Sequence, residues 1–176
     1  MVNELDLRGM EVALTKLGER CPVGSEIVII GGAAAVLSRW LNRATADIDV
    51  IAAEPRLAEL GKAIRAVAEE LGLPDGWMND GAKGYARALP PDFRERLVDL
   101  GQFGRLRVRS IGRKDFIVLK VYGMRGVDIE DLENLRATAE EMAFVRAQVP
   151  RIAEFDPKQA HHMELFLDQD ETSLKL

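Results

Sequence analysis

The sequence has a single cysteine, Cys21, and only two histidines among its 176 residues. One thiol cannot form an intrachain disulfide or supply the several thiolates of a structural zinc cluster. The two histidines, His161 and His162, are adjacent, and adjacent residues on a helix point about 100° apart, so they cannot chelate one ion together. These shortages exclude disulfide scaffolds and histidine- or cysteine-based metal sites, and they fit a reducing cytoplasm.

Long hydrophobic runs are also lacking, since no apolar segment approaches the roughly 20 residues needed to span a bilayer. The segment 1–10 carries Glu4, Asp6 and Arg8, so it cannot form the apolar core of a signal peptide. We therefore predict a cytoplasmic protein with no membrane partner. The net charge of −5 argues against a protein that coats nucleic acid without regard to sequence.

Local charge departs from this total in one basic stretch. Its members are Arg105, Arg107, Arg109, Arg113 and Lys114. The stretch is either the solvated face of a hairpin or a surface that contacts RNA, and the sequence leaves both interpretations open.

The composition, with 47% hydrophobic and 30% charged residues, is typical of one globular domain that spans residues 1–176. Periodicity and turn residues predict alternating helices and strands. The expected elements are a helix over 4–19, a strand over 26–30, a helix over 33–41, a strand over 47–52, a helix over 55–71, a hairpin of strands 96–100 and 105–111 joined by a turn at 101–104, a helix that Asp115 caps, a long helix from 128 that Pro150 ends, and a last helix over 156–167. This order indicates an α+β fold, with a short mixed sheet covered by helices and a C-terminal helical extension at about 128–170.

A long loop is expected over residues 73–93, which are rich in glycine and proline. Long irregular segments in compact domains are often functional. Trp77 in this loop either stacks on a bound base or anchors the loop by being buried.

The glycine pair Gly31-Gly32 lies between a predicted strand and a predicted helix. Glycine lets backbone N–H groups approach a ligand without a Cβ in the way, and a helix N-terminus favours phosphate. The same pair also fits an ordinary turn, so alone it does not define a site.

Two acidic residues, Asp47 and Asp49, are expected on the strand that follows. Residues i and i+2 of a strand face the same side, so the two carboxylates would repel each other unless a cation lies between them. A hard divalent ion such as Mg²⁺ suits carboxylate oxygens. The alternative is an edge of the sheet where both acids point at water.

Taken together, the glycine pair and the Arg43-x-Thr45-x-Asp47-Ile48-Asp49-Val50 segment resemble the nucleotidyltransferase superfamily of DNA polymerase β. Within it, they are similar to small bacterial proteins of the abortive-infection and MenT-like toxin group. The resemblance covers about residues 25–135 and implies a nucleotidyltransferase-like fold. It further implies Mg²⁺ held by Asp47 and Asp49, and an NTP held by Gly31, Gly32, Arg43 and Thr45.

A later segment, Asp115 to Leu132, is similar to a second motif of that group. In it the resemblance implies that Lys120 contacts the nucleotide and neutralises the triphosphate, that Asp128 is catalytic and that Asp131 helps to bind the nucleotide. The residues alone also fit a helix-surface lysine at 120 and a helix N-cap at 128.

The superfamily usually has a third carboxylate that completes a two-metal site. Asp99 is the metal ligand that the resemblance suggests, unless Asp128 or Asp131 substitutes or the site is incomplete. A complete site predicts an enzyme that transfers a nucleotidyl group from an NTP to an RNA acceptor, such as tRNA, or to a protein acceptor. An incomplete site predicts an inactive binding module, with a cognate partner protein in a toxin–antitoxin or phage-defence pair.

Overall fold

The computed structural model describes residues 5–173, and it describes the side chains of residues 5–169. The chain forms two compact units. Unit 1 comprises the described residues up to Ala86 together with Asp92–Gly112, and unit 2 comprises Arg87–Pro91 and the described residues from Arg113 onward. That the whole chain forms a single domain stays a prediction. Within residues 5–173, no helix is both long and apolar enough to cross a membrane.

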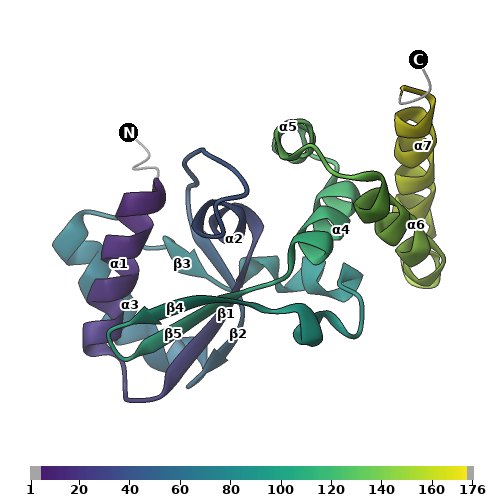
Figure 1. Cartoon of the computed structure of the whole chain (residues 1–176). Coiled ribbons are helices and arrows are strands. Elements are labelled where there is room, and N and C mark those ends of the chain that lie inside the picture. The colour runs from purple at the N-terminus through teal and green to yellow at the C-terminus, as the bar shows by residue number, and fades with distance from the viewer. Residues whose placement is uncertain (1–4, 174–176) are drawn as a thin grey trace. The chain divides into compact units, whose positions relative to one another are not determined.

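Unit 1 is built around a mixed five-stranded sheet with strand order β3-β2-β1-β5-β4 (Figure 1). β1 pairs antiparallel with β2 and parallel with β5, while β3 runs parallel to β2 and β4 antiparallel to β5. The predicted α+β class is therefore confirmed. The elements are α1 (Leu7–Arg20), β1 (Ser25–Ile30), α2 (Gly31–Leu37), β2 (Ile48–Glu54), α3 (Leu57–Leu71), β3 (Met78–Asn79), the 3-10 helices η1 (Gly81–Ala88) and η2 (Phe93–Arg96), β4 (Val98–Phe103) and β5 (Leu106–Ser110).

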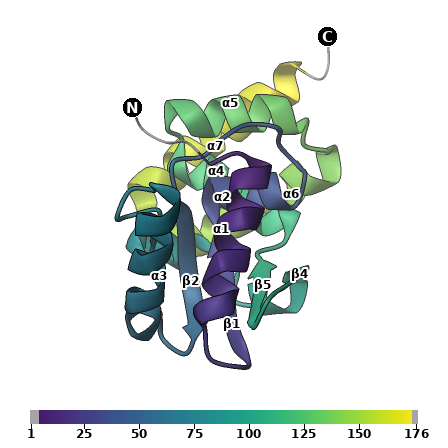
Figure 2. The same ribbon diagram turned by 90° about the vertical axis from the view of Figure 1, so that its left-hand side faces the viewer.

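Helices α1 and α3 cover one face of this sheet, and Figure 2 looks onto that face. The buried residues of each helix follow helical spacing and form one side of it; Leu14 belongs to the buried side of α1 and Ile64 to that of α3. They join Ile27, Ile29 and Val50 of the central strands in one hydrophobic cluster. Burial of this apolar surface holds the sheet in the register that places the site.

The opposite face of the sheet is more open. Alternation along the strands places Val28 and Ile30 of β1 on this face, with Asp49 and Ala52 of β2 and Arg109 of β5 beside them. Asp49, Ala52 and Arg109 are only half-buried. This face is therefore the accessible one for a ligand of unit 1.

Some predictions for unit 1 were wrong in detail, first among them the hairpin turn and the long loop. The hairpin turn is at Gly104 and Arg105, not at 101–104, because Gly101 lies inside β4 at a bulge and adopts a φ of +110°. The loop expected over 73–93 contains the short strand β3, which extends the sheet beyond β2.

Unit 2 contains four helices in its described residues. They are α4 (Arg113–Gly123), α5 (Gly126–Leu135), α6 (Ala139–Ala153) and α7 (Pro157–Ser173). The single long helix from 128 was a wrong prediction, because Arg136 turns to a left-handed φ of +50° and ends α5. Thr138 and Glu141 then form a capping box that starts α6, and Pro150 lies inside that helix. Asp115 was also expected as a cap, but it lies buried in the first turn of α4.

Candidate functional site

The bend between β1 and α2 is formed by two glycines at positions where a side chain would collide. Gly31 has a φ of +71°, which residues with a Cβ rarely adopt. A methyl group built on Gly31 would lie 3.0 Å from Oδ2 of Asp49. On Gly32 it would lie 2.8 Å from both Oγ1 of Thr45 and Nη2 of Arg43. The close approach of these three side chains therefore requires the glycine pair.

The segment that carries Arg43 and Thr45 is fixed in place by backbone hydrogen bonds. The amide of Leu5 donates to the carbonyl of Thr45 at 2.7 Å, and the amide of Thr45 donates back to Leu5 at 3.0 Å. The Thr45 hydroxyl donates to the carbonyl of Asp47 at 3.4 Å, and Nη1 of Arg43 donates to the carbonyl of Ala44 at 2.8 Å. These bonds hold the segment against the glycine bend.

Asp49 is the second residue of β2 and lies on the open face of the sheet, whereas Asp47 precedes the strand instead of lying on it as predicted. Between and after them, Ile48 and Val50 are buried in the core, while the two acids are half-buried. In the strand pairing, Asp49 lies opposite Ile30 of β1 and Asn79 of β3. The Asp49 carboxylate is thus close to the glycine bend, and the Asp47 carboxylate is held from β3 by Asn79.

Asn79 is a site residue that the sequence interpretation missed. Its Nδ2 donates to Oδ2 of Asp47 at 3.0 Å, and its Oδ1 accepts from the amide of Gly81 at 2.8 Å. Its own strand pairing with Asp49 fixes its backbone. Asn79 therefore orients the Asp47 carboxylate, and only the pairing of β3 with β2 reveals this role.

This pair of carboxylates fits a divalent cation. Mg²⁺ prefers oxygen ligands, and proteins often bind it with one or two carboxylates plus substrate phosphates. The absence of a side chain at Gly31 lets the Asp49 carboxylate approach the backbone of the bend. Across residues 5–173, no three acidic, histidine or cysteine side chains gather closely enough to hold one ion. Phosphate oxygens and water would therefore complete the coordination.

Asp99 is not brought to this pair. It lies on β4, which β5 and β1 separate from β2. Its carboxylate accepts from Nη2 of Arg107 at 2.7 Å, a hydrogen bond that lowers the pKa of Asp99 below its usual value. At the end of β5 beside β1, where a third carboxylate could stand, the residues are Ser110 and Ile111, which are buried and uncharged.

The predicted residues of the second motif meet in unit 2. Nζ of Lys120 lies 2.7 Å from Oδ1 of Asp128 and 2.7 Å from Oδ2 of Asp131, and all three side chains are buried. Arg125 adds a bond from its Nε to Asp128 at 2.8 Å. Burial alone would raise the pKa of Asp128, but the bonds from Arg125 and Lys120 outweigh it and lower that pKa. Lys120 is therefore a buried lysine paired with two carboxylates, and the interpretation as a helix-surface lysine is wrong.

Replacing Lys120 with methionine should lower the free energy of unfolding by about 3 to 5 kcal/mol, because it leaves buried carboxylates without their cation. The lowered pKa of Asp128 means that its contribution to stability is present above its ordinary pKa and is lost as the pH falls through the lowered value. The gap between wild type and variant, measured by urea denaturation, should therefore narrow in acid.

The matched control is Lys158→Met on the exposed surface of α7, which should change stability by less than about 0.5 kcal/mol. Equal losses in the two variants would contradict a structural role for the buried triad of Lys120, Asp128 and Asp131.

Most of the basic stretch is internally neutralised. Arg107 pairs with Asp99, Arg109 with Glu26, Arg113 with Glu141, and Lys114 with Glu140, at distances of 2.6 to 2.8 Å. Arg105 donates to the carbonyl of Glu19. These cations are therefore engaged within the protein rather than arrayed for phosphates.

Trp77 belongs to the core of unit 1. It is fully buried, and its Nε1 donates to the carbonyl of Ile64 at 3.1 Å. The interpretation of a loop anchored by a buried tryptophan is confirmed, and stacking on a base is wrong for this residue.

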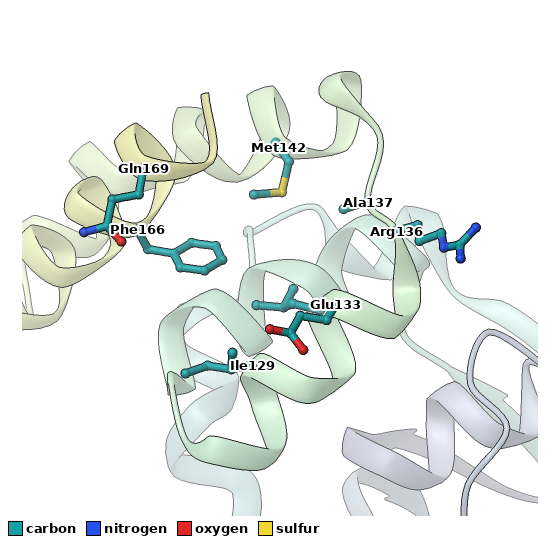
Figure 3. A pocket seen from close by; sticks show the side chains of 8 residues that line it. Ile129, Glu133, Arg136, Ala137, Met142, Phe166 and Gln169 are labelled. Carbon is teal, nitrogen blue, oxygen red and sulfur yellow. The ribbon is translucent and has the colours of Figure 1, made fainter. Parts of the chain in front are cut away.

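Unit 2 contains a separate pocket of about 380 Å³ beside α5 (Figure 3). Phe166 and Met142 point into it from α7 and α6, and Glu133 lies on its α5 side. Asp128 and Asp131 do not line it. None of the predicted site residues therefore lines the pocket, although Ile129 and Leu132 of the second motif do.

Comparison with known proteins gives a match at the level of the family. Neither the curated proteins nor the solved structures contain a match to this chain. A family model described as a nucleotidyltransferase of unknown function matches residues 9–142, which include the bend, both acids and the buried triad. The chain therefore belongs to this nucleotidyltransferase family, DUF6036.

Proposed function

We propose that the protein transfers a nucleotidyl group from a Mg²⁺-bound NTP to a hydroxyl acceptor. The observation that carries this proposal is the packing of Gly31 and Gly32 against Asp49, Thr45 and Arg43, which brings an acid, a hydroxyl and a guanidinium to the backbone of one bend. Family membership supports nucleotidyl transfer as the reaction class. The position of Asp47 and Asp49 supports a metal-dependent reaction.

Each residue of the site has a distinct part in this proposal. Asp47 and Asp49 would hold Mg²⁺, which neutralises phosphate charge when bound. The backbone at Gly31 and Gly32 would approach the phosphates closely, and Arg43 would offer its guanidinium to the leaving pyrophosphate. Asn79 would keep the Asp47 carboxylate oriented through its 3.0 Å hydrogen bond.

The buried triad of Lys120, Asp128 and Asp131 enters the proposal as a support of unit 2. The 2.7 Å contacts of Lys120 with both acids favour this role over direct neutralisation of a triphosphate. The resemblance that assigns catalysis to Asp128 and nucleotide binding to Lys120 and Asp131 is kept as the alternative. Loss of NTP affinity in a folded Lys120→Met variant would favour that alternative.

A second candidate is a non-catalytic nucleotide-binding module, which could serve with a cognate partner in a toxin–antitoxin or phage-defence pair. The observation that favours it is the lack of a third carboxylate beside the acid pair among the described residues. Two strands separate Asp99 from the pair, and the end of β5 carries the uncharged Ser110 and Ile111. Such a module would bind Mg·NTP without turning it over.

Titration calorimetry with a non-hydrolysable NTP tests the proposal at its first step. Binding should require Mg²⁺, and it should be lost in Gly32→Val, because the added side chain would occupy the space of Arg43 and Thr45. Gly76→Val is the matched control, since a Cβ there meets nothing within 4 Å. Mg²⁺-independent binding, or none at all, would rule the proposal out.

A further inference from the structure

A groove of about 330 Å³ lies on the open face of the sheet in unit 1. Its apolar part is formed by Val28, Ala52, Ala53 and Leu97. Charged side chains surround these residues in equal numbers of each sign, namely Glu26, Glu54, Arg94 and Arg109. The groove is thus amphipathic and locally neutral.

Neither acid lines the groove, which begins two residues along β1 from the level of Asp49. Val28 lies opposite Ala52, and two residues along the same strand Ile30 lies opposite Asp49. Two residues of a strand span about 7 Å. The glycine bend follows Ile30, so along β1 the level of Asp49 lies between the bend and the groove.

In-line displacement makes this order informative. The attacking oxygen and the leaving pyrophosphate occupy opposite sides of the reacting phosphorus. If the pyrophosphate lies toward the glycine bend, the attacking hydroxyl must come from the side of the groove. We propose that this groove binds the acceptor, and that the acceptor is a peptide segment that carries a serine, threonine or tyrosine hydroxyl. This inference rests on the proposed function.

The charges of the groove favour a peptide over RNA. Proteins that bind nucleic acid through its backbone neutralise several phosphates with lysine or arginine. Here Arg109 is already paired with Glu26 at 2.8 Å, and Arg94 lies over the ring of Phe93. The neighbouring Arg107 is paired with Asp99. A neutral backbone with an apolar side chain matches this surface better than a chain of phosphates.

The reaction balances without any further reagent. The peptide hydroxyl oxygen forms a bond to the α-phosphorus of the NTP, and the bond from that phosphorus to the bridging oxygen of pyrophosphate breaks. The hydroxyl proton passes to water, and the products are a nucleotidylated peptide and pyrophosphate.

The test uses the full chain, Mg²⁺ and α-³²P-labelled NTPs with two acceptors, a degenerate peptide library containing Ser, Thr and Tyr, and total tRNA. Wild type should label the peptides. Ala52→Phe fills the groove and should lower this labelling by about a hundredfold, since small misplacements of a reactant are that costly. Its affinity for Mg·NTP in calorimetry should stay unchanged. Ala58→Phe on the exposed side of α3 is the matched control and should label as wild type does.

A second variant keeps the inference testable if Ala52→Phe does not fold. Arg109→Lys keeps the positive charge but replaces the planar guanidinium that lines the groove and pairs with Glu26, so the KM for peptide should rise while the KM for NTP does not. Labelling of tRNA instead of peptide, or of neither polymer, would overturn the inference. So would a raised KM for NTP alone in Ala52→Phe, which would assign the groove to the nucleotide. A wild type that binds no Mg·NTP would instead overturn the proposed function itself.

Discussion

Asp49→Asn should reduce Mg²⁺-dependent nucleotidyl transfer by about 100- to 1000-fold, the usual cost of losing one charged or polar group that stabilises a transition state. The amide keeps the size of the side chain, so its close approach to Gly31 remains while the negative charge is lost. Transfer is measured as label incorporated from an α-³²P-labelled NTP, at saturating Mg²⁺. The fold of the variant is checked by circular dichroism.

Asp75→Asn is the matched control, because Asp75 is an exposed loop acid outside the site. It should retain wild-type transfer. An Asp49→Asn protein that still transfers label normally would show that the acid pair is not the metal site. If wild type binds Mg·NTP yet transfers nothing, the non-catalytic module becomes the better description.

Gly18→Ala should destabilise unit 1 by at least about 3 kcal/mol, a loss typical of severe overpacking. A methyl group on Gly18 would lie 1.6 Å from the carbonyl oxygen of Phe103, and backbone cannot move aside as a flexible side chain can. The turn that follows Phe103 is also bound to α1, because the amide of Arg105 donates to the carbonyl of Gly18 at 3.0 Å. Urea denaturation gives the free energy of unfolding.

Gly61→Ala provides the opposite control within a helix. A Cβ on Gly61 of α3 meets only Nη1 of Arg65 at 3.5 Å, an ordinary contact. Alanine there should raise stability by about 0.5 to 1 kcal/mol, because glycine loses more backbone entropy on folding. A Gly18→Ala protein as stable as wild type would mean that α1 does not rest on the β4–β5 turn as described.

Local pattern was enough to predict most elements of unit 1. The β-branched run at 27–30 indicates a buried strand, and the spacing of Leu60, Ile64 and Val67 indicates a helix; these residues are buried in the structure, so tertiary packing agrees with the local pattern. The α2 helix is shorter than predicted, because Arg39 turns to a left-handed φ of +59° after it ends. Nothing in the residue types around Arg39 signals that turn.

The break between α5 and α6 was readable but missed. Thr138 and Glu141 have the spacing of a capping box, which starts a helix rather than continues one. The apolar spacing on both sides of Arg136 resembles one continuous helix, and Pro150 suggested its end. Pro150 instead lies inside α6.

Local sequence placed the glycine bend beside the acids but could not supply their other neighbours. The contacts of Gly31 and Gly32 involve residues 11 to 18 positions later, so a short motif contains them. Asn79 reaches Asp47 from 32 residues away through a two-residue strand that no periodicity reveals. The salt bridges of Arg109 and Arg107 depend on strand register, so the basic stretch could not be recognised as neutralised from composition.

The assignment of Arg87–Pro91 to unit 2 has a practical consequence for dissecting the protein. The guanidinium of Arg151 donates to the carbonyls of Arg87 and Ala88, at 3.1 and 2.6 Å, and Ala88 and Leu89 are buried. A truncation after Gly112 would strip these residues of their partners and expose their apolar side chains. No single cut yields two intact fragments, so mutational work is best carried out on the uncut polypeptide.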